Sequence, residues 1–258
     1  MLAAAVELNS AECFRLDGRL PWVEFHDDGD VVWIFAGDTW PRNSVALARF
    51  TPATAHKRIG EILAVHLRKK VACNWIVGPV SQPPDLGRHL RAHGFNCMIH
   101  CAGMACDLNN IPQAPRAPDG VTVELTDDPP SLQPLTTERR RRYQEGRNAI
   151  AHMTPRQVWN FTARADGKPV GETMICAGAG VAGIHTVVVL EKFRGRGIGT
   201  ALVHAALTTA REQLGYRVAV LAATGMGLAI YARLGFREVC KLSFWKYGKM
   251  GQRRSLQT

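Results

Sequence analysis

The sequence has no long apolar run and no regularly spaced cysteine pairs, and each absence excludes a class of protein. No stretch approaches the roughly 20 apolar residues that cross a bilayer. The apolar residues 1–6 have no basic flank and end at Glu7, so we expect neither a membrane span nor a signal peptide. The seven cysteines show no disulfide framework, which favours reduced thiols in a cytoplasmic protein.

Acidic residues are also scarce, since 22 Asp and Glu face 32 Lys and Arg, for a net charge of +10. This balance favours an acidic partner. Part of the excess lies in two arginine runs, at residues 139–142 and 253–254, and such runs are typical of solvated helix faces or chain ends. No RNA-recognition, zinc-finger or helix-turn-helix signature accompanies them, which disfavours a nucleic-acid role.

Metal ligands in a recognisable pattern are missing too. Cys97, His100, Cys101 and Cys106 lack the paired C-x-x-C spacing of zinc sites. Because alternate strand residues point to opposite faces, Cys97 and His100 are expected to diverge. Cys176 lies in an apolar strand without an evident activating partner, which favours core packing. We therefore expect no metal.

What the sequence does contain is a strand, a glycine loop and a helix over residues 187–200. An apolar β-branched run predicts a buried strand, and apolar residues at helical spacing follow Ile198. Glycines let the backbone approach a ligand, and the first helical turn has unpaired N–H donors. Two arginines add charge for a pyrophosphate. The residues assigned to phosphate binding are Arg194, Gly195, Arg196, Gly197, Ile198, Gly199 and Thr200.

The spacing within this loop separates three kinds of glycine loop. A P-loop requires a Gly-Lys-Ser/Thr ending that is absent here. A dinucleotide fingerprint requires a third glycine where Thr200 stands, and an acidic residue that the next strand, 217–223, does not offer. The remaining pattern is Arg/Gln-x-x-Gly-x-Gly/Ala, which Arg194, Gly197 and Gly199 fill. It resembles the coenzyme A loop of the GNAT superfamily of N-acetyltransferases.

The order of predicted elements occurs twice, which indicates an internal repeat. Strand, loop, helix, strand, short helix and Gly-Phe run from Phe50 to Gly94 and again, at nearly the same spacing, from Phe193 to Gly235. The first copy has no glycine in its loop, and Pro52 lacks an N–H. We expect an α/β fold with mixed sheets, as two tandem GNAT-like domains. The predicted parts are a degenerate domain without a cofactor loop (1–108), a proline-rich linker (109–120) and a catalytic domain (121–258).

Local signals predict individual elements within this plan. Thr54 is predicted to cap a helix, and Asp166-Gly167 to form a hairpin turn. Residues 136–144 and 154–159 are predicted to be two helical pieces, and a final strand is expected over 236–247.

The resemblance implies acetyl-CoA as the acyl donor, with backbone groups of Val187, Val188 and Val189 facing its pantetheine and acetyl carbonyl. It implies Tyr231 as the acid that protonates the leaving thiolate, whose first-half equivalent is Leu90. Many family members carry Asn seven residues before this tyrosine, where the present chain has Thr224.

The general base is left open among His185, Glu172 and a water relay. The expected acceptor is an amine of a small molecule or peptide, attacked directly in a ternary complex. The first half is expected to pack against the second and shape the acceptor cleft, in a monomer with an internal pseudo-dimer or in a homodimer. The alternative is a non-catalytic module that binds coenzyme A or nucleic acid.

Overall fold

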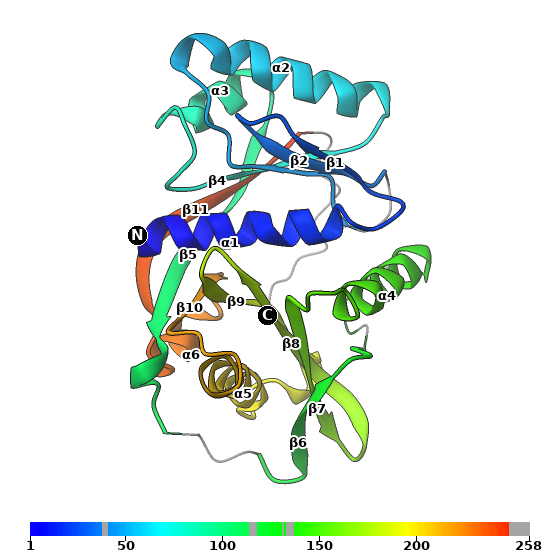
Figure 1. Cartoon of the computed structure of the whole chain (residues 1–258), viewed down its shortest axis with the longest axis vertical. Coiled ribbons are helices and arrows are strands. Elements are labelled where there is room, and N and C mark those ends of the chain that lie inside the picture. Colours follow the sequence, from blue (N-terminus) through cyan, green and yellow to red (C-terminus); the bar gives the residue numbers. More distant parts are fainter. Residues whose placement is uncertain (38–40, 114–117, 131, 133–136, 248–258) are drawn as a thin grey trace.

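The chain forms one mixed sheet of 11 strands with helices on both faces (Figure 1). The computed structural model describes residues 1–37, 41–113, 118–130, 132 and 137–247. The strand order is β1-β2-β3-β4-β11-β5-β10-β9-β8-β7-β6. Within the described ranges, no helix is both long and apolar enough to cross a membrane.

The first half supplies three helices and five strands. They are α1 (Leu2–Asp17), β1 (Glu24–Asp27), β2 (Val32–Phe35), β3 (Ser44–Ala46), α2 (Pro52–Arg68), β4 (Cys73–Val77), α3 (Leu86–Ala92) and β5 (Asn96–Asp107). A short 3-10 turn, Leu108–Asn110, follows. The second half contains β6 (Val121–Thr126), α4 (Thr137–Ala151), β7 (Val158–Ala165), β8 (Lys168–Gly178), β9 (Val181–Val189), α5 (Ile198–Glu212), β10 (Val218–Ala223), α6 (Leu228–Arg233) and β11 (Arg237–Tyr247).

Alternating apolar side chains divide the sheet into two buried faces. In β10, Ala219 and Leu221 pack in the core cluster that contains α5, whereas Val220 packs with Val6 of α1. In β4, Trp75 belongs to the cluster with α2, whereas Ile76 belongs to the one with α1. Helix α1 therefore covers one face across strands of both halves, and α2 and α5 cover the other face.

The two halves exchange their last long strands. Strand β11 pairs with β4 and β5, both of the first half, and β5 pairs with β10 of the second half. All three pairings are antiparallel. The sheet is consequently continuous through the junction, and the last strand of each half, β5 or β11, pairs with strands of the other half.

The predicted internal repeat is confirmed in the backbone. The N–H of Phe95 donates to the carbonyl of Leu90 at 3.1 Å, and the N–H of Phe236 donates to that of Tyr231 at 3.0 Å. The glycine before each phenylalanine is left-handed, with φ of 84° at Gly94 and 90° at Gly235. Leu90 and Tyr231 thus occupy the same position in the two copies.

Several local predictions are confirmed and several are wrong. Asp166 and Gly167 both have positive φ, 50° and 72°, as a two-residue type I′ hairpin requires. Helix α2 is capped by Thr51, because Pro52 is its first residue, and Thr54 completes the capping box. Residues 154–159 form no helix, since β7 begins at Val158. Strand β1 was not predicted.

The prediction that Cys97 and His100 diverge is also wrong. A register shift lies between the pairs Phe244–Ile99 and Trp245–Cys97, which leaves one extra residue in β5. A bulge of this kind breaks the alternation of faces, and Cys97 Sγ lies 3.5 Å from His100 Nε2. Predictions on residues 114–117 of the linker, on residue 136, and on Arg253 and Arg254 fall outside the described residues.

Candidate functional site

The central feature of the site is a gap between the parallel strands β9 and β10. Their ladder consists of two pairs, Ala219–Ala182 and Val220–Gly183, after which no pairing continues in the described strands. A register shift between β8 and β9 and a positive φ of 55° at Thr186 mark a bulge in β9 at this point. Such a bulge re-aims a strand, so the edge of β9 from residue 184 onward is left open toward β10.

The glycine loop follows β9 and leaves its backbone donors free. Gly195 and Gly197 have φ of 75° and 84°, a conformation that costs glycine nothing and other residues about 1–2 kcal/mol. In the described chain, the N–H groups of residues 195–200 donate to no protein acceptor. Arg194 and Arg196 are exposed and form no ion pair with the described residues. The loop is therefore an unfilled cluster of donors and positive charge.

In the corresponding loop of the first half, most backbone donors are engaged or missing. Thr51 and Thr54 satisfy each other's backbone N–H groups at 3.0 and 3.2 Å. Pro52 occupies the first helical position and has no N–H. The start of α2 is thus closed by its own side chains, which removes the anion-binding capacity of a helix N-terminus.

The gap between strands is closed in the first half as well. Gln82 donates its N–H to the carbonyl of Ala48 at 2.7 Å and accepts from Phe50 at 3.2 Å, which bridges the ends of β3 and β4. Glu7 of α1 lies over this bridge, fully buried, and accepts from the Val80 N–H at 2.7 Å and the Ser81 hydroxyl at 2.6 Å. Among the described residues, only the second half therefore keeps an open gap together with a free loop.

A cavity of about 330 Å³ occupies the gap between β9 and β10. Its second-half lining is Ile184, His185, Thr186, Val187, Leu221, Ala222, Thr224 and Tyr231, and its first-half and β11 lining is Ser10, Cys13, Phe14, Ile76 and Phe244. A site of this size holds a small organic group. No carboxylate or Lys/Arg side chain is among the described residues that line it.

Tyr231 reaches the cavity from α6, and its ring packs edge-on against Phe236. A Cβ at Gly227 would lie 2.4 Å from the tyrosine ring, so a glycine is required there. The Tyr231 hydroxyl has no hydrogen-bond partner among the described residues. Burial raises the pKa of Tyr231, which keeps the phenol protonated.

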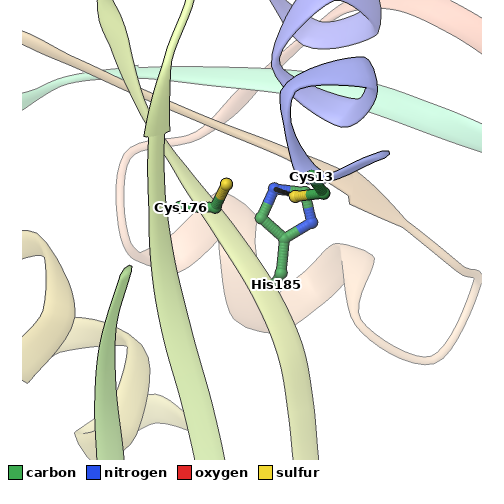
Figure 2. A group of neighbouring side chains, drawn as sticks. All are labelled: Cys13, Cys176 and His185. Carbon is green, nitrogen blue, oxygen red and sulfur yellow. Dashed lines mark hydrogen bonds between the residues drawn. The ribbon is translucent and has the colours of Figure 1, made fainter. Parts of the chain in front are cut away.

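His185 lies on β9 and lines the cavity. Its ring lies beside Cys13 of α1 (Figure 2). Asn9 donates through Nδ2 to the carbonyls of Cys176 and Gly178, so its Oδ1 is an acceptor, and His185 Nε2 lies 2.9 Å from that oxygen. The Nε2 atom therefore carries the proton in the neutral ring. Burial lowers the pKa of His185 to about 4, which makes the ring neutral and weakly basic.

Glu172, the other candidate base, does not line this cavity. Its carboxylate is fully buried and lies 3.2 Å from Arg147 Nη1. Burial raises the pKa of Glu172 to about 6, against the opposing effect of Arg147. The structure thus brings His185 and Tyr231 to one cavity and directs Glu172 elsewhere.

Sequence reasoning missed the residues of α1 that line the cavity, namely Ser10, Cys13 and Phe14. They lie more than 170 positions before His185 and carry no motif. Their contribution depends on where α1 packs on the shared sheet, which no local signal encodes.

Comparisons with known proteins find a family model over part of the chain and a shared fold over nearly all of it. Residues 122–236 match the model of the acetyltransferase (GNAT) family. A GCN5-related N-acetyltransferase from Kribbella flavida superposes with a TM-score of 0.68 at 21% identity, covering 98% of each chain. A tandem GNAT protein from the clavulanic acid biosynthesis pathway gives 0.59 at 19% identity, covering 95% of this chain and 94% of that one.

A third similar structure is a GCN5-related N-acetyltransferase from Sphaerobacter thermophilus, with a TM-score of 0.60 at 19% identity over 94% of this chain and 91% of that one. No curated protein matches the sequence. At these identities the solved structures show the fold, and the family model covers the half that contains the open gap and the free loop. Residues 122–236 are thus similar to the acetyltransferase (GNAT) family, and the whole chain has the mixed α/β tandem GNAT-like fold.

Proposed function

We propose that this protein transfers an acetyl group from acetyl-CoA to a primary amine of a small molecule or peptide, by direct attack in a ternary complex. The observation that carries the proposal is the free loop at residues 195–200, which follows strand β9, together with the cavity that β9 lines and that contains an unpartnered tyrosine hydroxyl in the described chain. Acetyl-CoA would supply the acetyl group as a thioester. The first half of the chain would not bind acetyl-CoA.

The loop residues would hold the pyrophosphate of the donor. The N–H groups of residues 195–200 and the helix dipole of α5 provide an anion site, and the side chains of Arg194 and Arg196 add charge-assisted hydrogen bonds. The exposed edge of β9 at Val187, Val188 and Val189 then provides backbone groups for the pantetheine arm, at the point where β9 has left β10.

Tyr231 would protonate the thiolate as it leaves. A phenol with a raised pKa stays protonated at neutral pH, and its hydroxyl has no competing protein partner in the described chain. General acid catalysis of this kind contributes about 10²- to 10⁴-fold.

On the acceptor side, the cavity itself would favour a neutral amine. No described carboxylate lines it to stabilise an ammonium, and burial disfavours a charged amine. His185 is the candidate general base that lines the cavity, but its lowered pKa makes it a weak base. We assign it the role of orienting the amine or a relay water, with the proton passing on to solvent.

The first half would shape the acceptor end of the cavity. Ser10, Cys13 and Phe14 of α1 form part of the wall, whereas the first half's own loop and strand gap are closed. This half would thus act as a structural partner that completes the site of the second half.

The test is an acceptor panel with acetyl-CoA, scored by chromatographic detection of free coenzyme A and of the acetylated amine. We expect turnover with at least one amine. Tyr231→Phe should lower kcat by about 10²- to 10⁴-fold with little change in the affinity for acetyl-CoA. Tyr216→Phe is the matched control, because Tyr216 is partly buried against the same core but does not line the cavity.

A protein that binds acetyl-CoA but shows no turnover with any amine would support a pure binding module instead. Equal losses of kcat in Tyr231→Phe and Tyr216→Phe would remove the assigned role of Tyr231.

A further inference from the structure

Two thiols and an imidazole meet where α1 crosses the second half of the sheet. Cys13 comes from α1, Cys176 from β8 and His185 from β9, and one ligand atom of each lies within 4.8 Å of the others (Figure 2). Cys176 is fully buried, and the other two are half-buried. Among the described residues, this is the one group of three or more such side chains close enough to share an ion.

The distances suit a tetrahedral metal ion. Zinc binds thiolate sulfur at about 2.3 Å and imidazole nitrogen at about 2.0–2.1 Å, so the S···N edge of a tetrahedral site is roughly 3.5 Å. Cys13 Sγ lies 3.6 Å from His185 Nε2. No large side-chain movement is therefore needed to bring these two donors onto one ion.

The surrounding backbone leaves room for the cluster. Gly183 pairs with Cys176 across the β8–β9 ladder, and a Cβ at Gly183 would lie 1.7 Å from Asn9 Oδ1 and 2.6 Å from His185 Nε2. A glycine is thus required for the imidazole and the Asn9 amide to occupy this space. Asn9 Oδ1, 2.9 Å from Nε2, or a water from the adjoining cavity is available as a fourth ligand.

The electrostatics also favour a divalent cation. A dication held by two thiolates and a neutral imidazole gives a site of zero net charge. Soft sulfur ligands with imidazole select zinc over magnesium or calcium.

We propose that Cys13, Cys176 and His185 form a zinc site that ties the N-terminal helix to strands β8 and β9 at the acceptor end of the cavity. Binding releases the two thiol protons and moves the imidazole proton from Nε2 to Nδ1, with no change in the oxidation state of sulfur. The ion would link the two halves of the chain and engage the imidazole nitrogen nearest α1. This inference does not rest on acetyl transfer.

The experiment uses the full chain without a polyhistidine tag, reduced and stripped of metal, titrated with Zn²⁺ against a chromophoric chelator. We expect one high-affinity Zn²⁺ per chain, and a Co²⁺ derivative with the near-ultraviolet absorption of cobalt–thiolate bonds. A hundredfold excess of Zn²⁺ over its Kd should raise the unfolding midpoint by about 5–10 °C.

Three variants and one control locate the ion. Cys13→Ser, Cys176→Ser and His185→Gln should each weaken Zn²⁺ binding at least tenfold, while circular dichroism verifies that each remains folded. Cys97→Ser is the matched control, because Cys97 and His100 form a two-donor pair at 3.5 Å and no third ligand joins them in the part of the chain that the structure describes.

If Cys176→Ser does not fold, Cys13→Ser decides, since Cys13 is partly exposed on a helix. Absence of stoichiometric Zn²⁺ binding, a Co²⁺ spectrum without thiolate bands, or an equal loss in Cys97→Ser would each overturn the proposal. So would a Cys13–Cys176 disulfide that persists under reducing conditions.

Discussion

Replacing Gly197 by alanine tests the assigned loop most directly. Gly197 is the N-cap of α5, with φ of 84° and ψ of −1°. A Cβ there meets no atom closer than Pro118 Cγ at 3.8 Å, so the methyl group fits sterically. The perturbation is thus confined to the backbone, where holding an L-residue in the left-handed region costs about 1–2 kcal/mol.

That free energy must appear in one of two measurable quantities. If the loop keeps its shape, Gly197→Ala lowers the free energy of unfolding by about 1–2 kcal/mol. If the loop relaxes, the donors at residues 195–200 lose their alignment, and the affinity for acetyl-CoA falls by roughly 5- to 30-fold, the equivalent of the same energy. We expect mainly the second result, because the loop is exposed and makes few protein contacts.

Gly199→Ala is the matched control. Gly199 does not have a positive φ, and the nearest atom to its Cβ is Val189 Cγ2 at 3.7 Å, an ordinary contact. The resemblance to the coenzyme A loop also allows alanine at this position. We expect its affinity for acetyl-CoA to change less than threefold.

The assay is isothermal titration of each variant with acetyl-CoA, accompanied by thermal unfolding of the free protein. Equal affinities for wild type and Gly197→Ala, at unchanged stability, would refute the assignment of the loop. Equal losses in Gly197→Ala and Gly199→Ala would show that a methyl group anywhere in the loop blocks the donor, and that the backbone argument is wrong.

Three further predictions concern pH, stability and the dependence of one half on the other. Because burial raises the pKa of Tyr231, kcat should not decrease with rising pH below about pH 10. A decrease of kcat near pH 8 that is absent in Tyr231→Phe would contradict this prediction. Burial raises the pKa of Asp17 to about 8, above its unfolded value near 4. Between these two pH values the folded protein binds one more proton than the unfolded chain, so the free energy of unfolding should fall as pH rises, by up to about 1.4 kcal/mol per pH unit. Asp17→Asn should flatten this pH dependence in chemical denaturation, and an unchanged slope would refute the role of Asp17. Residues 119–258 alone should not form an active monomer, because both pairing partners of β11 lie in the first half; size exclusion and activity of this fragment, with and without co-expressed residues 1–113, decide the point.

The chemistry of individual residues was sufficient to predict a large part of the fold from the sequence. The glycines at 195 and 197, the Asp166-Gly167 turn and the two Gly-Phe pairs each require a backbone conformation that few residues adopt. Such positions can be recognised in sequence because the constraint belongs to the residue itself. The internal repeat followed from their order, and it correctly paired Tyr231 with Leu90.

Tertiary structure decided the rest. The exchange of β5 and β11 cannot be inferred from either strand, because both have the same apolar pattern whether they pair within a half or across the junction. The bulge at Thr186 opens the gap between β9 and β10, and threonine carries no signal for it. The position of α1 on the sheet determines which side chains line the acceptor end of the cavity.

The sequence by itself determined that one half has a glycine loop before a helix and that the other half has a proline there instead, because glycine, proline and helix ends act locally. Only the packed structure decided that Asn9 and Cys13 meet Cys176 and His185. Contacts between residues so far apart arise from how helices and strands bury their apolar faces, and this burial depends on the whole sheet.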